Sequence, residues 1–185
     1  MKVDTQTFLR LVEGAGTLVS VDIEATGLKG DYNSILCASF KPWGRSAYTI
    51  SVEKPGADRQ LVKEIKAELE KYDCWVTYYG RGFDMPDINT RLLYHRMLPV
   101  EKRPHIDMYW QLKAKTLMSR RSQGHLLNWL RLPEQKMSLS AEAWNEVLSA
   151  PKKAMREMVK RNVSDVVGLE CLYDRTKHLL TDITT

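Results

Sequence analysis

The chain has 185 residues, 43% of them hydrophobic, and its 28 Lys or Arg residues exceed its 23 Asp or Glu residues to give a net charge of +5. This length fits one domain and allows about 70% of the unfolded surface to be buried, which excludes a small scaffold held together by disulfides or a structural metal. We therefore expect a single domain over residues 1–185. The three cysteines are widely spaced, and the chain has no apolar N-terminal stretch and no window of about 18 apolar residues. These features indicate a cytoplasmic protein in a reducing compartment, neither secreted nor inserted in a membrane.

The first part of the chain predicts one helix followed by three antiparallel strands. A helix is expected over residues 5–12, and Gly14 and Gly16 mark its end. Residues 18–24 alternate between apolar and polar side chains, which is the period of a strand. Two further β-prone segments, 35–40 and 47–52, are joined by a turn that contains Pro and Gly.

The rest of the chain alternates between helices and short strands. In order, the expected elements are a helix over 58–71, a strand over 74–78, a helix over 85–96, a strand over 105–108, helices over 109–118 and 125–132, and a long helix from 151 to about 180. The order of elements is therefore three strands, helix, strand, helix, strand and then helices, which predicts an α/β protein.

The positive charge is concentrated in residues 91–136, which hold ten Lys or Arg residues and three acids for a local charge of +7. Aromatic and hydrogen-bonding side chains are interspersed among these bases, as expected of a surface that follows phosphates and stacks bases. The alternative is solvated helix faces around buried aromatic residues. Trp43 lies in a tight turn and is the tryptophan freest to stack on a base. The tryptophans expected in the core are Trp75, Trp110, Trp129 and Trp144.

Four carboxylates occupy unusual positions. Asp22 and Glu24 are two residues apart on a strand, so they leave the same face about 6.5–7 Å apart and could hold one cation; the alternative is the solvent face of a half-buried strand. Asp84 precedes a helix, where it could instead be the N-cap. Asp165 lies on a largely apolar helix face, where a carboxylate is costly unless it binds a metal or pairs with a base such as Arg161.

One shared cause explains all four positions better than four separate ones. Carboxylates without Cys or His ligands form an all-oxygen site, which suits Mg²⁺ or Mn²⁺. Asp107 follows a predicted strand near this site, and we expect it to be a structural acid or a helix cap rather than a fifth ligand.

Three motifs in this order resemble the DEDD (DnaQ-like) 3′–5′ exonuclease superfamily. The first is Val21-Asp22-Ile23-Glu24-Ala25-Thr26-Gly27-Leu28, the second runs over residues 76–86 and includes Gly82-Phe83-Asp84, and the third is Asn162-Val163-Ser164-Asp165-Val166. The likeness spans nearly the whole chain and is greatest to stand-alone, poorly characterised members. It implies a ribonuclease-H-like fold, whose mixed five-stranded sheet has three antiparallel strands followed by parallel ones and is flanked by helices.

The resemblance also implies an activity. Members hydrolyse single-stranded DNA or RNA from the 3′ end to 5′-mononucleotides, with two Mg²⁺ or Mn²⁺ ions held by the residues that match Asp22, Glu24, Asp84 and Asp165. Thr26 and Tyr79 match positions near the substrate, although the family often has Asn where this chain has Tyr79.

The chain departs from the family at the general base. The Tyr or His that the family carries on the last helix is replaced by Arg161 and Lys160. Arginine stays protonated, and lysine could act as a base only if desolvation lowered its pKa. We therefore expect Lys160 or Arg161 to orient the scissile phosphate. The alternatives are a module that binds nucleic acid or docks a partner with little or no cleavage, and endonucleolytic cleavage at the same site.

Overall fold

The structure is a computed structural model that describes residues 4–134, 146, 151–181 and 183. The expectations for Lys136 and Trp144 fall outside these residues. The helices and strands, in chain order, are α1 (Thr5–Ala15), β1 (Leu18–Ala25), β2 (Ile35–Pro42), β3 (Tyr48–Ser51), α2 (Arg59–Leu69), β4 (Cys74–Thr77), α3 (Asp84–Tyr94), β5 (His105–Asp107), α4 (Met108–Lys115), α5 (Gln123–Trp129), α7 (Pro151–Thr176) and the 3-10 helix η1 (Lys177–Leu179).

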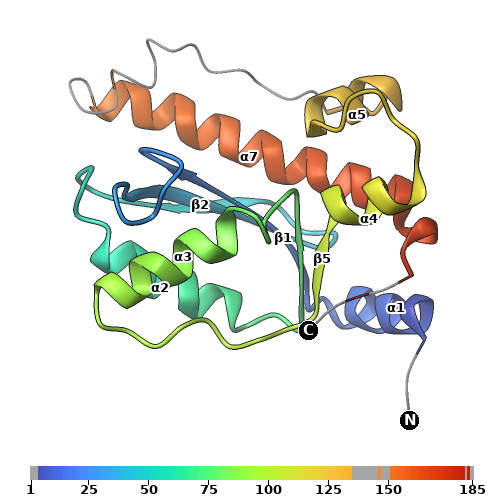
Figure 1. Cartoon of the computed structure of the whole chain (residues 1–185), viewed down its shortest axis with the longest axis horizontal. Coiled ribbons are helices and arrows are strands. Elements are labelled where there is room, and N and C mark those ends of the chain that lie inside the picture. Colours follow the sequence, from blue (N-terminus) through green and yellow to red (C-terminus); the bar gives the residue numbers. More distant parts are fainter. Residues whose placement is uncertain (1–3, 135–145, 147–150, 182, 184–185) are drawn as a thin grey trace.

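The five strands form one mixed sheet, which confirms the predicted fold class. The strand order is β3-β2-β1-β4-β5, and β1 lies in the centre. The first three strands pair antiparallel, whereas β1 pairs parallel with β4 and β4 pairs parallel with β5. Helix α7 lies along one face of the sheet, and α2 and α3 cover the other (Figure 1). This packing buries both faces of β1.

Most helix boundaries differ from the predicted ones by a few residues, and local hydrogen bonds explain two of the differences. Helix α4 begins at Met108 because the Asp107 carboxylate accepts a hydrogen bond from the Tyr109 amide at the N-cap. Ser122 caps α5 in the same way, through the His125 amide. The last helix ends at Thr176 and continues as the short η1, rather than as one helix to residue 180.

The tryptophans divide between the core and the surface. Trp75 is buried, with 4% of its surface exposed, as predicted. Trp110 and Trp129 are 41% and 62% exposed, so their assignment to the core was wrong. Helix α4 buries Met108 and Leu112, and Trp110 projects from the opposite side of that helix. The expectation for Trp43 was also wrong, because its ring packs edge-on against Tyr173 at 5.4 Å.

The described part of the basic segment, residues 91–134, does not place all of its bases on the surface. Arg91 is buried and binds the Asp58 carboxylate through Nε and Nη2 at 2.8 and 2.9 Å, so it contributes no surface charge. Farther along, Gln123 at the start of α5 donates to the backbone carbonyl of Asp165 at 2.7 Å. The part of the segment around α5 therefore lies beside one of the four predicted carboxylates.

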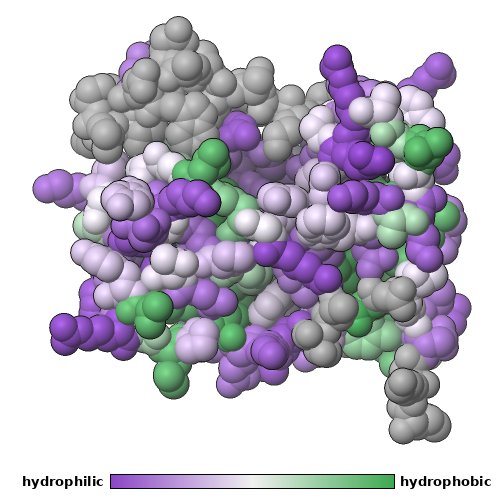
Figure 2. Space-filling view, viewed as in Figure 1, coloured by the Kyte–Doolittle hydropathy of each residue, from purple (hydrophilic) through white to green (hydrophobic). Residues whose placement is uncertain are grey.

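The visible surface is mixed in character. On the face drawn in Figure 2, hydrophobic residues form small separate areas among hydrophilic ones. Among the described residues, no helix has the length and apolar character needed to cross a membrane.

His105 on β5 makes stability depend on pH. Its ring is buried against Thr77, with Nε2 2.7 Å from Thr77 Oγ1, and burial lowers its pKa to about 4 from the ordinary 6.5. Between these pH values the unfolded chain binds a proton that the folded chain does not, so the free energy of unfolding rises with pH over this window. Urea titrations from pH 4 to 7 should show a flatter rise in the His105→Gln variant than in the parent. The matched change at exposed His178 should keep the parent slope, and identical slopes for all three proteins would contradict the assignment.

Candidate active site

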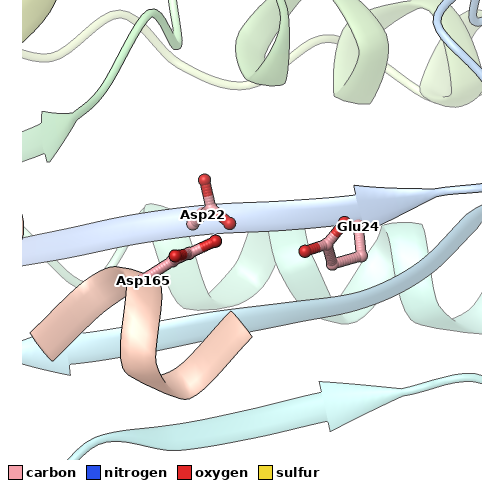
Figure 3. Close-up of side chains that lie close together, drawn as sticks. All are labelled: Asp22, Glu24 and Asp165. Atoms are coloured by element: carbon pink, nitrogen blue, oxygen red, sulfur yellow. The ribbon is translucent and has the colours of Figure 1, made fainter. Parts of the chain in front are cut away.

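Asp22 and Glu24 project from the same face of the central strand β1, toward α7. Asp165 projects from α7 against them (Figure 3). Oxygen atoms of these three carboxylates lie within 4.8 Å of one another. Glu24 and Asp165 are buried, and Asp22 is half-buried. Three of the four predicted acids therefore form one cluster, built from a strand and a helix that are far apart in sequence.

Helix α7 also brings an amide group to the cluster. Asn162 is fully buried one turn before Asp165, and its Nδ2 donates to Asp22 Oδ2 at 2.6 Å. This contact holds the Asp22 carboxylate in one orientation. The sequence places Asn162 in the third motif and on the same helix face as Asp165, three residues away, but its contact with Asp22 is seen only in the structure.

Asp84 lies next to the cluster but outside the group of three. It is the first residue of α3 and not its N-cap, so the capping alternative was wrong. Its Oδ1 instead accepts a hydrogen bond from the Ile23 amide at 3.1 Å, at the residue between Asp22 and Glu24. Burial, with the negative charges of Asp107 and Glu24, raises the pKa of Asp84 to about 7, although the Ile23 amide opposes this shift.

Arg161 lies between two of the clustered carboxylates. Its Nη1 binds Glu24 Oε1 at 2.5 Å, and its Nη2 lies 3.7 Å from Asp165 Oδ2. The ion pair that sequence analysis considered for Asp165 is therefore present, and it includes Glu24. Lys160, the neighbouring candidate, is exposed on α7, so it lacks the desolvation that a basic role for lysine requires.

A pocket opens beside the cluster. It has a volume of about 390 Å³ and is lined by Glu24, Thr26, Phe83 and Arg161, among others. The Thr26 hydroxyl accepts a hydrogen bond from the Ser34 amide at 3.0 Å, which closes the base of the loop after β1. Two predicted substrate contacts, Thr26 and Arg161, therefore share one pocket with a predicted metal ligand.

Asp107 organises the chain around the second motif, as the structural alternative predicted. Its two carboxylate oxygens accept hydrogen bonds from the backbone amides of Tyr79 and Arg81, both at 2.9 Å, in addition to capping α4. Tyr79, the fourth predicted substrate contact, is 44% exposed and has a positive φ of 65°. It lies after β4, outside the lining of the pocket beside Glu24.

The residues of the cluster fit a hard divalent cation. All of the candidate ligands are carboxylate oxygens, which Mg²⁺ and Mn²⁺ prefer, and the oxygens of three of them already converge. The raised pKa of Asp84 is the expected result of burying an acid beside other acids.

Comparison with known proteins agrees with this fold. The family model of the RNase_H superfamily matches residues 19–177, so the chain belongs to that superfamily, as the three motifs indicated. A search of curated proteins found no match.

Among solved structures, the chain is similar to the family B DNA polymerase from the hyperthermophilic archaeon Pyrobaculum calidifontis, with 16% identity and a TM-score of 0.67. That match covers 86% of this chain but only 24% of the polymerase. The chain is also similar to Brucella melitensis NrnC, with 20% identity and a TM-score of 0.59 over 89% of this chain and 74% of that one. At these identities the likeness shows a shared fold.

Proposed function

We propose that the protein is a metal-dependent 3′–5′ exonuclease that hydrolyses single-stranded DNA or RNA to 5′-mononucleotides. The observation that carries the proposal is the convergence of carboxylate oxygens of Asp22, Glu24 and Asp165 within 4.8 Å. Asp84 lies next to them and accepts a hydrogen bond from the amide between Asp22 and Glu24 on β1. Membership of the RNase_H superfamily supports a nuclease. The 3′–5′ direction is proposed from the resemblance of the three motifs to the DEDD exonucleases.

Each residue has a defined task in this proposal. Asp22, Glu24, Asp84 and Asp165 would hold two Mg²⁺ or Mn²⁺ ions. Such ions, when bound, polarise the phosphate and make water a better nucleophile. Asn162 orients the Asp22 carboxylate, and the Ile23 amide orients Asp84. The pocket of about 390 Å³ beside Glu24 would take the terminal nucleotide, with Phe83 against its apolar parts.

A time course on matched 5′-labelled DNA and RNA oligonucleotides tests activity, direction, sugar preference and metal need together. With Mg²⁺ or Mn²⁺ we expect a ladder of labelled products that shortens with time, and no products in EDTA. A circular single strand should survive, since an exonuclease cannot start on it. Cleavage of the circle would identify an endonuclease, and an intact linear substrate in both metals would contradict the proposal.

A second candidate function is that the site lacks catalytic activity. Arg161 occupies a position where the family carries its general base, and it is paired with Glu24, a proposed metal ligand. In that case the chain binds nucleic acid, or docks a partner, without cleaving it. Tight oligonucleotide binding with no turnover in either metal would favour this function over the first.

The Arg161 ion pair predicts how the site responds to metal. A divalent ion bound by Glu24 must displace the guanidinium or share the carboxylate with it, so Arg161→Gln should tighten Mn²⁺ binding about tenfold, the equivalent of about 1.4 kcal/mol. Titration calorimetry of the full chain measures this directly. Hydrolysis should fall in the same variant, because the charge that faces the phosphate is lost.

Opposite changes in metal affinity and rate distinguish this role from simple damage to the fold. Lys160→Gln is the matched control, because Lys160 is the exposed neighbour on α7. It should leave Mn²⁺ affinity unchanged. Weaker Mn²⁺ binding in Arg161→Gln would overturn the interpretation.

A further inference from the structure

A cluster of partly exposed aromatic side chains lies where β4 and β5 end. Tyr79 follows β4, and Tyr109 and Trp110 belong to the first turn of α4. The Tyr79 and Tyr109 rings are 5.0 Å apart and edge-on, and the Tyr79 and Trp110 rings are 6.1 Å apart with 31° between their planes. Tyr79 is 44% and Trp110 is 41% exposed. These three residues are called the aromatic platform below.

The backbone under the platform is held rigidly. Tyr79 has a left-handed φ of 65°, which is strained for a bulky side chain. The Asp107 carboxylate holds it there by accepting the Tyr79 amide at 2.9 Å, and the same oxygen accepts the Tyr109 amide at 3.1 Å. One buried acid therefore joins both halves of the platform. Strained backbone of this kind is common at binding sites, which favours a role in binding for the platform.

Packing of the core does not account for Trp110. Helix α4 contacts the core through Met108 and Leu112, on the face opposite Trp110. Lys113 lies one turn farther along, and its Nζ is 4.6 Å from the centre of the Trp110 ring. An exposed aromatic ring with a cation over its face offers partners for both a nucleobase and its phosphate.

The platform lies at the same edge of the sheet as the carboxylates. Strands β1, β4 and β5 run parallel, so their carboxyl ends meet at one edge. Asp22 and Glu24 are near that end of β1, and the platform begins at the ends of β4 and β5. Adjacent strands are about 4.8 Å apart, so β5 lies roughly 10 Å from β1.

We propose that the aromatic platform, with Lys113, is a base-stacking site for single-stranded nucleic acid upstream of the scissile phosphate. The assignment of the strand's polarity rests on the proposed exonuclease function, whereas the binding site itself does not. Bases stack on the exposed Trp110 and Tyr79 rings, and Lys113 contacts a phosphate. The site is insensitive to sequence, because every base has an aromatic face.

Fluorescence anisotropy of 5′-labelled oligonucleotides of eight nucleotides, measured with the full chain, gives Kd. Measurement in EDTA separates binding from metal-dependent cleavage. Trp110→Ala should raise Kd about tenfold, since stacking one base on an aromatic ring is worth about 1–3 kcal/mol. Trp110→Phe should restore most of the affinity. Trp129→Ala removes an exposed tryptophan of α5 as the matched control and should leave Kd unchanged.

Abasic oligonucleotides test stacking itself. If the rings bind bases, an abasic strand should bind the parent protein at least as weakly as a normal strand binds Trp110→Ala. On the abasic strand, the variant should bind no more weakly than the parent. Lys113→Gln should lower the slope of log Kd against log salt by about 0.7, the value for one phosphate of a single strand.

The outcomes separate this proposal from the proposed function. Weaker binding by Trp110→Ala to normal but not abasic strands supports the platform, whether or not any metal supports cleavage. Equal Kd values for the parent, Trp110→Ala and Trp129→Ala overturn it, even if the protein degrades oligonucleotides. Absence of measurable binding to any single strand overturns it too. Circular dichroism melting of each variant confirms that the fold is intact.

Discussion

Replacing Asp22 with Asn is expected to lower metal-dependent hydrolysis of a 5′-labelled oligonucleotide by at least about 1000-fold, because a lost metal ligand removes several kcal/mol of transition-state stabilisation. Asparagine has the shape of aspartate, and its amide oxygen can still accept the hydrogen bond from Asn162. The change therefore removes charge from the cluster with little change in packing. Initial rates at saturating Mg²⁺ and Mn²⁺ measure the effect, and Asp165→Asn should behave alike.

Two further measurements make this result specific to the cluster. Mn²⁺ titration should show weaker binding in Asp22→Asn, independently of any activity. Asp73→Asn is the matched control, because Asp73 is an exposed acid just before the amino end of β4, whereas the cluster lies at the carboxyl ends of the parallel strands. It should keep the parent rate. An Asp22→Asn protein that degrades the oligonucleotide at the parent rate would falsify the assignment of the site.

Arg91→Met should destabilise the fold by about 3–5 kcal/mol, the cost of leaving a buried charge without its partner. Asp58 is completely buried, and it accepts hydrogen bonds from Arg91 Nε at 2.8 Å, Arg91 Nη2 at 2.9 Å and the Ile35 amide at 3.0 Å. Burial opposes ionisation of Asp58, but hydrogen bonds from Arg91, His95 and Ile35 outweigh it and lower its pKa. Urea unfolding at pH 7, where Asp58 is ionised, measures the loss.

The lowered pKa gives this prediction a second readout. The stabilisation due to Asp58 is present above its unfolded pKa near 3.8 and is lost as pH falls through the lower folded pKa. The double variant Asp58→Asn with Arg91→Met should recover part of the loss, because the ion pair then leaves no unpaired charge behind. Arg59→Met, the same change at an exposed arginine of α2, should alter stability by less than about 0.5 kcal/mol. A similar loss in Arg91→Met and Arg59→Met would contradict the role of the buried pair.

The order and type of the elements were predictable because the apolar residues of each segment repeat with the period of a helix or of a strand. The alternation in residues 18–24 identified β1, and the helical spacing after residue 151 identified α7. The helix ends were less accurate, because caps such as Ser122 act through individual hydrogen bonds. The expectation that residues 1–185 form a single domain stays a prediction.

The candidate site was partly predictable for the same reason. Asp22 and Glu24 are neighbours on one strand, so their common face follows from a two-residue period. Asp165 joined them only through the motif resemblance and its unusual place on an apolar helix face. The contacts of Arg161 with Glu24 and of Asn162 with Asp22 cross 137 and 140 residues, and no local pattern records them.

The sequence alone determined the α/β class, the strand order along the chain and which acids could share a cation. Only the tertiary structure decided which helix faces are covered. Periodicity shows that residues of one segment lie on the same side, but burial depends on what packs there. Arg91, counted as surface charge, is buried because Asp58 meets it, and Trp110, assigned to the core, is exposed because α4 packs through its other face.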